Sequence, residues 1–153
     1  TLSRSSAASD VYKRQISKSA SKIMSNGGSL ITLTYIGSNK TTPNYNVMGV
    51  AKAALETSVK YLSVDLGKNN IRVNAISAGP MKTIAGAAIS GARHVYRYSE
   101  KIAPLQKNPD LEQVGNAALY LLSDISSGVT GLTHYVDGGL KVVGIPNQDM
   151  VSI

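Results

Sequence analysis

Two side chains with complementary chemistry, Tyr45 and Lys52, stand seven residues apart in a segment of helical periodicity. This spacing is two helical turns, so both side chains lie on one face, with the lysine leaning back toward the phenol. An ammonium beside a phenol favours the phenolate, which predicts a lowered pKa for Tyr45. The pair would then be a donor suited to an oxygen that develops negative charge, although a tyrosine and a lysine at this spacing also arise by chance.

A second tyrosine, Tyr35, lies at the predicted carboxyl end of the preceding strand. Ligands of open α/β sheets bind outside the carboxyl ends of the strands. We therefore expect Tyr35 to meet Tyr45 at a shared site.

The elements that must position these residues follow from periodicity and turn signals. Asp110 with Gln113 three residues later predicts a capped helix start, and the residues 137–139 predict a closing turn rather than a catalytic acid. The expected elements are a helix over 16–24, a buried parallel strand over 29–35, a loop over 37–43, a helix over 46–66, a strand over 71–76, short helices or a mobile flap over 83–103, a helix over 111–122 and a strand over 133–136.

Strands that alternate with helices in this order predict an α/β fold with a parallel sheet. No GxGxxG turn and no glycine-rich phosphate loop follow a strand. The fold class is therefore the C-terminal half of a Rossmann-type doubly wound parallel sheet, with the N-terminal βαβ units absent. We assign residues 1–15, which are rich in serine and lack periodicity, to a non-native or disordered leader, and residues 16–153 to the C-terminal portion of one Rossmann-like domain.

The composition excludes several classes of protein. The 153 residues contain no cysteine, which excludes disulfide scaffolds, thiol catalysis and cysteine-ligated zinc, and which fits a cytoplasmic location. The two histidines, forty residues apart, predict no metal site. Residues 1–25 hold five basic side chains against one acid and so carry +4 of the net +7, which argues against a nucleic-acid partner. No apolar run is long enough to span a membrane.

The tyrosine–lysine motif is one of several segments whose sequence is typical of a known protein family. The segments that carry a family likeness are residues 35–37, 43–55, 72–80, 110–124 and 136–139. They resemble the NADH-dependent enoyl-acyl-carrier-protein reductases, a divergent branch of the short-chain dehydrogenase/reductase superfamily, of which only the C-terminal half is matched. The common superfamily pattern, Tyr-x3-Lys after an upstream serine, is not met because position 49 is Gly49 and position 32 is Thr32. A carbonyl-reducing relative is therefore disfavoured.

The resemblance implies an oxidoreductase that reduces the trans-2 double bond of enoyl-acyl-carrier-protein thioesters with NADH in fatty-acid biosynthesis. It implies that Tyr45 bonds the thioester carbonyl oxygen and that Lys52 holds the nicotinamide ribose. Tyr35 would be the second catalytic tyrosine and would shape the acyl pocket with Met48, which could equally be a core side chain. The segment expected to contact nicotinamide and pyrophosphate comprises Met81, Lys82, Thr83, Ile84 and Ala85.

Partners and alternatives complete these expectations. A basic surface formed by Arg93, Arg97 and Lys101 is either a solvated face or a docking site for the acidic acyl carrier protein. The resemblance also implies a homo-oligomer, which is a tetramer in the family. We expect the chain alone to be inactive, because the dinucleotide-binding half has no counterpart in it. The runner-up function is a non-catalytic remnant that serves as an oligomerisation or carrier-protein-binding module.

Overall fold

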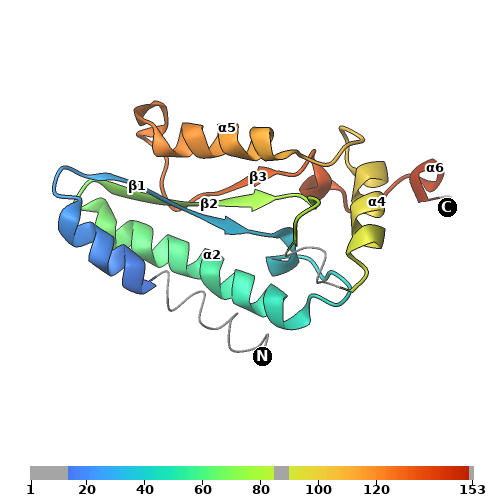
Figure 1. Cartoon of the computed structure of the whole chain (residues 1–153), viewed down its shortest axis with the longest axis horizontal. Helices are drawn as coiled ribbons and strands as arrows, with labels where there is room; N and C mark the ends of the chain where they lie inside the picture. The colour runs from blue at the N-terminus through green and yellow to red at the C-terminus, as the bar shows by residue number, and fades with distance from the viewer. Residues whose placement is uncertain (1–13, 85–89, 152–153) are drawn as a thin grey trace.

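A three-stranded parallel sheet lies between two long helices in the computed structural model, which describes residues 14–84 and 90–151 (Figure 1). The strand order is β1 (Gly28–Thr34), β2 (Ile71–Ala78) and β3 (Thr133–Val136), and both neighbouring pairs are parallel. Helix α2 (Asn46–Gly67) covers one face of the sheet, and α5 (Leu111–Leu122) covers the other. The predicted α/β class and the parallel arrangement are confirmed.

The central strand forms the core of the molecule. Seven of the eight residues of β2 are buried, and they alternate between the two helical layers. Val73 and Ala75 pack with Val59 of α2, whereas Ile76 packs with Leu121 of α5. A strand covered on both faces needs mainly apolar or small residues, and the buried Asn74 of β2 is satisfied by hydrogen bonds with the backbone of Val129 and Leu132.

The first strand differs from its prediction in two respects. We predicted a buried strand over 29–35, but β1 is an edge strand within the described residues, and Leu33 is 54% exposed. The strand also ends at Thr34, so Tyr35 stands between β1 and the short turn η1 (Ile36–Ser38). A strand is fully buried only when it has a neighbouring strand on each side. A run of apolar residues does not show whether both neighbours are present.

The start of α5 follows its sequence signal. The Asp110 carboxylate accepts from the Gln113 backbone N–H at 2.8 Å, and the Gln113 side chain accepts from the Asp110 backbone at 3.1 Å. This reciprocal capping box satisfies two donors that the first helical turn leaves without partners. The predicted bounds of 111–122 are confirmed.

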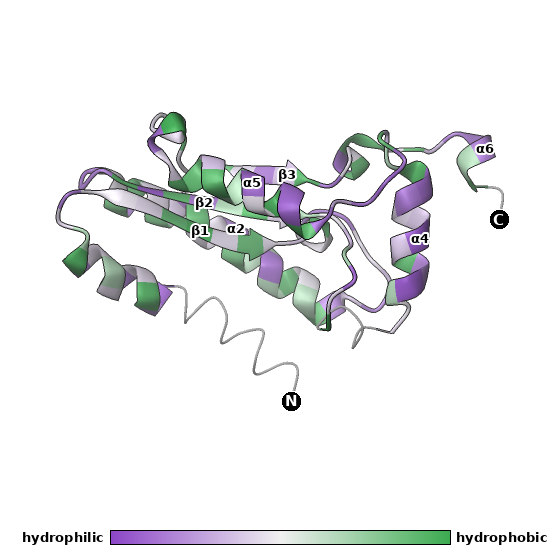
Figure 2. Ribbon diagram, turned by 45° about the horizontal axis from the view of Figure 1, so that its top comes forward, coloured by the Kyte–Doolittle hydropathy of each residue, from purple (hydrophilic) through white to green (hydrophobic). Residues whose placement is uncertain are grey.

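Helix α4 (Ala92–Ile102) stands across the carboxyl end of the sheet, where all three strands point (Figure 1). The sequence predicted short helices or a mobile flap over 83–103, and the described part instead contains this helix of 11 residues. Figure 2 shows α4 as largely hydrophilic, and the residues that it buries are Ser99 and Ile102. The remaining short elements are η2 (Asp124–Ser126), η3 (Leu140–Val142), α6 (Gln148–Val151) and a helix over residues 14–23.

The helix over residues 14–23 begins two residues before the predicted 16, and it includes two residues that we had assigned to the leader. The rest of that predicted leader, residues 1–13, lies outside the described residues. Among the described residues, no helix is both long and apolar enough to cross a membrane.

Candidate active site

Tyr45 lies at the N-terminus of α2, where its ring packs closely against Gly37 and Gly49. The residue is the N-cap of α2 and is only 8% exposed. A side chain on Gly37 would overlap the Tyr45 ring, and a Cβ on Gly49 would lie 2.7 Å from the Gly37 carbonyl oxygen. The turn η1 and the first turns of α2 therefore approach too closely for any residue but glycine at these two positions. A lysine at position 49, as in the common Tyr-x3-Lys pattern, has no room here.

Tyr35 meets Tyr45 as expected from their places in the sequence. The two ring centroids are 5.0 Å apart with planes at 64°, an edge-to-face contact. Aromatic pairs favour this arrangement because the positive edge of one ring faces the negative face of the other. Tyr35 also forms a side-chain hydrogen bond with Thr42, which partly offsets the effect of burial on its raised pKa.

The predicted effect of Lys52 on Tyr45 is wrong in direction. Burial, reinforced by the neighbouring Tyr35, raises the pKa of Tyr45 to about 12. Within the described residues, the Lys52 ammonium donates to the backbone oxygen of Leu33 at 3.0 Å, and no hydrogen bond joins it to the Tyr45 phenol. The sequence places the two residues seven positions apart, but desolvation of the phenol outweighs an ammonium that is engaged elsewhere.

The raised pKa changes the chemistry that Tyr45 can perform. A phenol that titrates near pH 12 is neutral at physiological pH and donates its proton to a hydrogen bond. Burial lowers the pKa of Lys52, and the carboxylate of Glu56 one turn later opposes that shift. The site thus combines a neutral buried donor with a half-buried amine.

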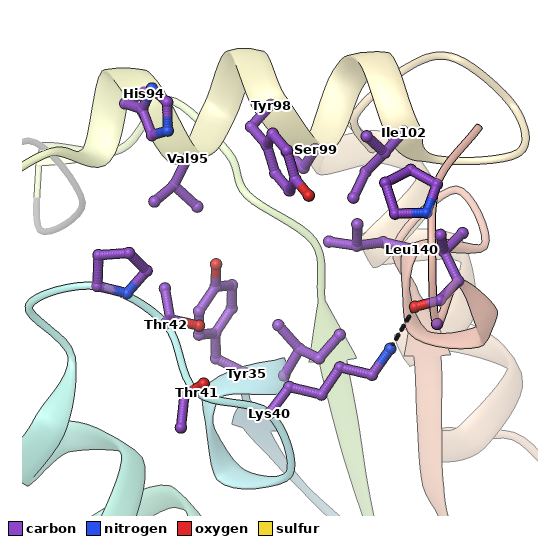
Figure 3. Close-up of a pocket in the computed structure, with 15 residues that line it drawn as sticks. Tyr35, Lys40, Thr41, Thr42, His94, Val95, Tyr98, Ser99, Ile102 and Leu140 are labelled. Atoms are coloured by element: carbon purple, nitrogen blue, oxygen red, sulfur yellow. Dashed lines mark hydrogen bonds between the residues drawn. The ribbon is translucent and has the colours of Figure 1, made fainter. Parts of the chain in front are cut away.

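A pocket of about 450 Å³ opens on the far side of Tyr35, below α4 (Figure 3). Its walls are mainly apolar and come from the η1 region, α4 and the C-terminal segment. In Figure 3, Tyr35 and Thr42 face Val95 and Tyr98 of α4 across the open space. The lining includes Ile36, Pro43, Val95, Tyr98, Ile102, Leu140, Val143 and Pro146.

Lys40 links the loop after η1 to the C-terminal segment that forms one wall of this pocket. Its ammonium donates to the backbone oxygens of Lys141 at 2.8 Å and Val143 at 2.7 Å. These two bonds, of which Figure 3 draws the one to Val143, hold the C-terminal segment beside the loop that follows η1. The pocket is therefore built from parts of the chain about one hundred residues apart.

The other predicted site residues lie apart from this buried cluster. Met48 is half-buried on α2, and Met81 packs against the core cluster between the sheet and α5. Lys82 is exposed with its ammonium 5.0 Å from the Tyr96 ring centroid, Thr83 is exposed, and Ile84 is 96% exposed. Ala85 lies outside the described residues. Residues 81–84 are not among those that line the pocket beneath α4.

Sequence reasoning missed the group that ties the site together. The Glu56 carboxylate on α2 accepts hydrogen bonds from Thr34, Ser38 and Asn39. A glutamate four residues after Lys52 on one helix was a visible signal, because side chains at this spacing are neighbours. The residues that donate to it come from outside the helix, and nothing local in the sequence marks them.

The histidines take no part in the tyrosine cluster. His94 lines the pocket from α4 and stacks on Tyr98 at 6.2 Å between centroids, whereas His134 lies on β3 near Tyr120. Within residues 14–84 and 90–151, no group of three or more metal-binding side chains could hold an ion.

Known proteins are similar to this chain over most of the residues described above. A family model described as enoyl-(acyl carrier protein) reductase matches residues 14–141. Enoyl-[acyl-carrier-protein] reductase [NADH] 1 of Rhizobium meliloti is 57% identical over 134 residues, which cover 88% of this chain and 49% of the relative. The chain spans about half the length of the curated relatives that it matches.

Solved structures agree with this assignment of fold. The FabI crystal structure from Candidatus Liberibacter asiaticus superposes with a TM-score of 0.85 at 52% identity, covering 88% of this chain and 52% of that one. An enoyl-(acyl-carrier-protein) reductase from Anaplasma phagocytophilum, solved in complex with NAD, superposes with a TM-score of 0.82 at 55% identity, covering 86% of this chain and 50% of that one.

Proposed function

This chain belongs to the enoyl-(acyl carrier protein) reductase family, and we propose that it supplies the catalytic half of an enzyme that reduces the trans-2 double bond of enoyl-acyl-carrier-protein thioesters with NADH. The relatives reported above are named as NADH-dependent reductases of this class. The reaction, the substrate and the cofactor are carried to this chain on that likeness and on the site described above. The alternatives, a carbonyl-reducing enzyme and a non-catalytic module, gain no support from these relatives.

The observation that carries the proposal is the buried pair of tyrosines beside an apolar pocket. Tyr45 is neutral and almost fully buried, and its ring contacts Tyr35 at 5.0 Å between centroids. Tyr35 in turn lines a pocket of about 450 Å³ with mainly apolar walls. A donor and an adjoining apolar space are what an acyl thioester requires, since it has one polar carbonyl and a long hydrocarbon chain.

The chemistry assigned to Tyr45 is donation to the thioester carbonyl oxygen. Reduction at the β-carbon pushes negative charge onto this oxygen as the enolate forms, and a neutral phenol stabilises that charge by a hydrogen bond. A pKa near 12 keeps the proton on Tyr45 throughout the physiological range. Tyr35 holds the Tyr45 ring by its edge-to-face contact and lines the apolar pocket on its other side.

The donors near Lys52 fit a dinucleotide cofactor. An ammonium carries three donors, and one of them is used on the Leu33 carbonyl. The other two suit the vicinal hydroxyls of a ribose. Bound NADH supplies the hydride for the reduction. Lys52 orients the sugar, and residues 81–84, which belong to the segment assigned to the cofactor, follow β2 at its carboxyl end, where dinucleotides bind in open α/β sheets.

The acyl group and its carrier have separate places on the molecule. The pocket beneath α4 receives the acyl chain against Val95, Ile102 and Leu140. Arg93 and Arg97 are exposed on the same helix, and with Lys101 they form the surface proposed for the acidic carrier protein. Met48, three residues after Tyr45 on α2, is assigned to the substrate site on the family likeness and is not part of the pocket lining beneath α4. A homo-oligomer and a cytoplasmic location remain part of the proposal.

The test joins this chain to the half of a relative that the chain does not span. Residues 16–153 are joined to the first half of the Rhizobium meliloti enzyme, whose second half is 57% identical to this chain. Consumption of NADH with a crotonyl thioester is followed by absorbance, and a β-ketoacyl thioester is the matched control. We expect the hybrid to reduce the enoyl substrate and to leave the keto substrate unchanged.

The 153-residue chain alone is assayed in parallel, and NADH binding to both proteins is measured by calorimetry. We expect the hybrid to bind NADH and the chain alone to bind too weakly to saturate at millimolar cofactor. A folded hybrid that reduces no enoyl thioester, or that reduces only the ketone, would reject the proposed function. An active chain alone would show that it holds a complete cofactor site.

A further inference from the structure

The Glu56 carboxylate joins three separate parts of the chain. It accepts from the Thr34 hydroxyl at 2.7 Å, from the Ser38 hydroxyl, and from the Asn39 amide at 3.1 Å. Thr34 is the last residue of β1, Ser38 ends η1, and Asn39 follows it. A carboxylate accepts about four hydrogen bonds, and bonds to a charged acceptor are stronger than neutral ones. One side chain on α2 therefore fixes the whole turn between β1 and the loop that leads to Tyr45.

The same network reaches across the sheet. Thr34, Ser77 and Tyr135 are register partners on the three parallel strands, so their side chains share the face toward α2. The Asn39 amide that bonds Glu56 also donates to the Tyr135 hydroxyl at 3.2 Å. The Ser77 hydroxyl between them is buried and has no hydrogen-bond partner among the described residues. Glu56 thus stands over a polar row in an otherwise apolar interface, where an acceptor is costly to lose.

Both reactive side chains depend on the parts that Glu56 holds. The Tyr45 ring lies against Gly37, which is the middle residue of η1, so the position of η1 sets the position of the ring. The Lys52 ammonium donates to the carbonyl oxygen of Leu33, the neighbour of Thr34 in β1. Lys52 is also one helical turn from Glu56 on α2, where the carboxylate favours its charged form.

We propose that Glu56 is a positioning residue for the reductase, which holds η1 and the end of β1 so that the Tyr45 phenol and the Lys52 ammonium keep the geometry the reaction requires. This inference rests on the proposed function for its effect on turnover. Its structural part, that Glu56 holds η1 in place, does not depend on the proposed function. Displacement of a reacting group by about 1 Å costs on the order of 100-fold in rate.

The experiment uses Glu56→Gln, which keeps the length of the side chain but replaces a two-oxygen acceptor by one oxygen and one donor. Ser38→Ala is the second variant, because it removes a hydroxyl that donates to Glu56 and accepts from the Asn39 amide, and it leaves α2 intact. Asp65→Asn is the matched control, since Asp65 is an exposed acid on the same helix. Each variant is made in the 153-residue chain and in the hybrid enzyme.

Amide hydrogen exchange is the first measurement. We expect exchange in a peptide spanning residues 35–45 to accelerate in Glu56→Gln and Ser38→Ala, with peptides from α5 unchanged and Asp65→Asn like the parent. In the hybrid, we expect kcat to fall by about 10- to 100-fold in Glu56→Gln, with KM for the enoyl thioester within about twofold. A side chain that only stabilised the fold would lower the melting temperature without this separation of kcat from KM.

The possible outcomes separate the two proposals. Unchanged exchange at residues 35–45 in Ser38→Ala, or a kcat within about twofold of the parent in both variants, would overturn the positioning role. If Glu56→Gln fails to fold, Ser38→Ala alone decides by the same criteria. A parent hybrid that reduces no enoyl thioester rejects the proposed function, while local acceleration of exchange would still support the hold of Glu56 on η1.

Discussion

Two regions that the sequence assigns to one site are built in opposite ways. The inner region, formed by Tyr35, η1 and the first half of α2, is closed by glycine contacts, paired aromatic rings and the Glu56 network. The outer region, residues 81–84 with α4, is mostly exposed. Tyr45 in the inner region is 8% exposed, whereas Ile84 in the outer region is 96% exposed.

This difference separates two tasks. A donor that stabilises developing charge is effective when it is held in place before the reaction, because no reorganisation is then required. The inner region meets this condition with the same packing that forms the core. Residues 81–84 of the outer region belong to the segment assigned to the cofactor, and three of these four side chains are exposed. We therefore expect substitutions in the inner region to change turnover and the free energy of unfolding more than substitutions in the outer region.

The largest effect is expected from Tyr45→Phe in the hybrid enzyme. The change removes the buried donor and keeps the ring, so turnover of the crotonyl thioester should fall by about 100- to 1,000-fold. Single-turnover absorbance measures it. Tyr61→Phe is the control, because Tyr61 is 71% exposed on the same helix. Turnover within about threefold of the parent would show that Tyr45 is not the donor.

Lys52→Met should weaken cofactor binding and slow the chemistry together. Loss of a charged hydrogen-bond donor costs about 1.5–3 kcal/mol, so the Kd for NADH should rise by roughly 10- to 100-fold. Calorimetry on the hybrid measures the Kd, and Lys60→Met on the exposed part of α2 is the control. An unchanged Kd would remove the ribose role of Lys52.

The glycine contact predicts opposite effects at the two ends of α2. Gly49→Ala forces a Cβ to within 2.7 Å of the Gly37 oxygen and should lower the free energy of unfolding by about 1–3 kcal/mol. Gly67→Ala meets nothing within 4 Å and should raise it by about 0.5–1 kcal/mol. Urea unfolding of the hybrid measures both. Equal effects of the two variants would contradict the close approach.

The pKa of Tyr45 predicts an alkaline loss of stability. Its folded value of about 12 lies above the ordinary value of 10, so the unfolded chain releases this proton first as the pH rises. The contribution is complete below pH 10 and is lost between pH 10 and about 12, at no more than about 1.4 kcal/mol per pH unit. Unfolding free energies of the parent and Tyr45→Phe across this range measure it. Parallel curves would show that the phenol is not desolvated.

The smallest effect is expected in the outer region. Lys82→Ala removes an ammonium that lies 5.0 Å from the Tyr96 ring centroid at an exposed site. Such a contact contributes about 0.5–1 kcal/mol, so urea unfolding should change by no more than that amount. A loss above about 2 kcal/mol would mean that the outer region is held as firmly as the inner one.

The sequence by itself determined the local features of this protein. Periodicity and turn residues located the strand over 133–136 and the helix over 111–122, because hydrophobic spacing and the Asp110–Gln113 capping box act within a few residues. The meeting of Tyr35 and Tyr45 was also expected, since strand carboxyl ends and the following helix starts gather at one edge of a parallel sheet, whereas the edge-to-face geometry of their rings was not. The family likeness rested on the same short segments.

Tertiary structure alone decided how these residues behave. The pKa of Tyr45 rises instead of falling because burial by parts of the fold outside the helix outweighs a lysine at the right spacing. Glu56 organises the site through Thr34, Ser38 and Asn39, up to 22 residues earlier in the chain. Gly49 is fixed by the backbone of η1 and not by its own helix. Desolvation and close approach depend on which segments the fold brings together, and such distances between segments are not encoded in local spacing.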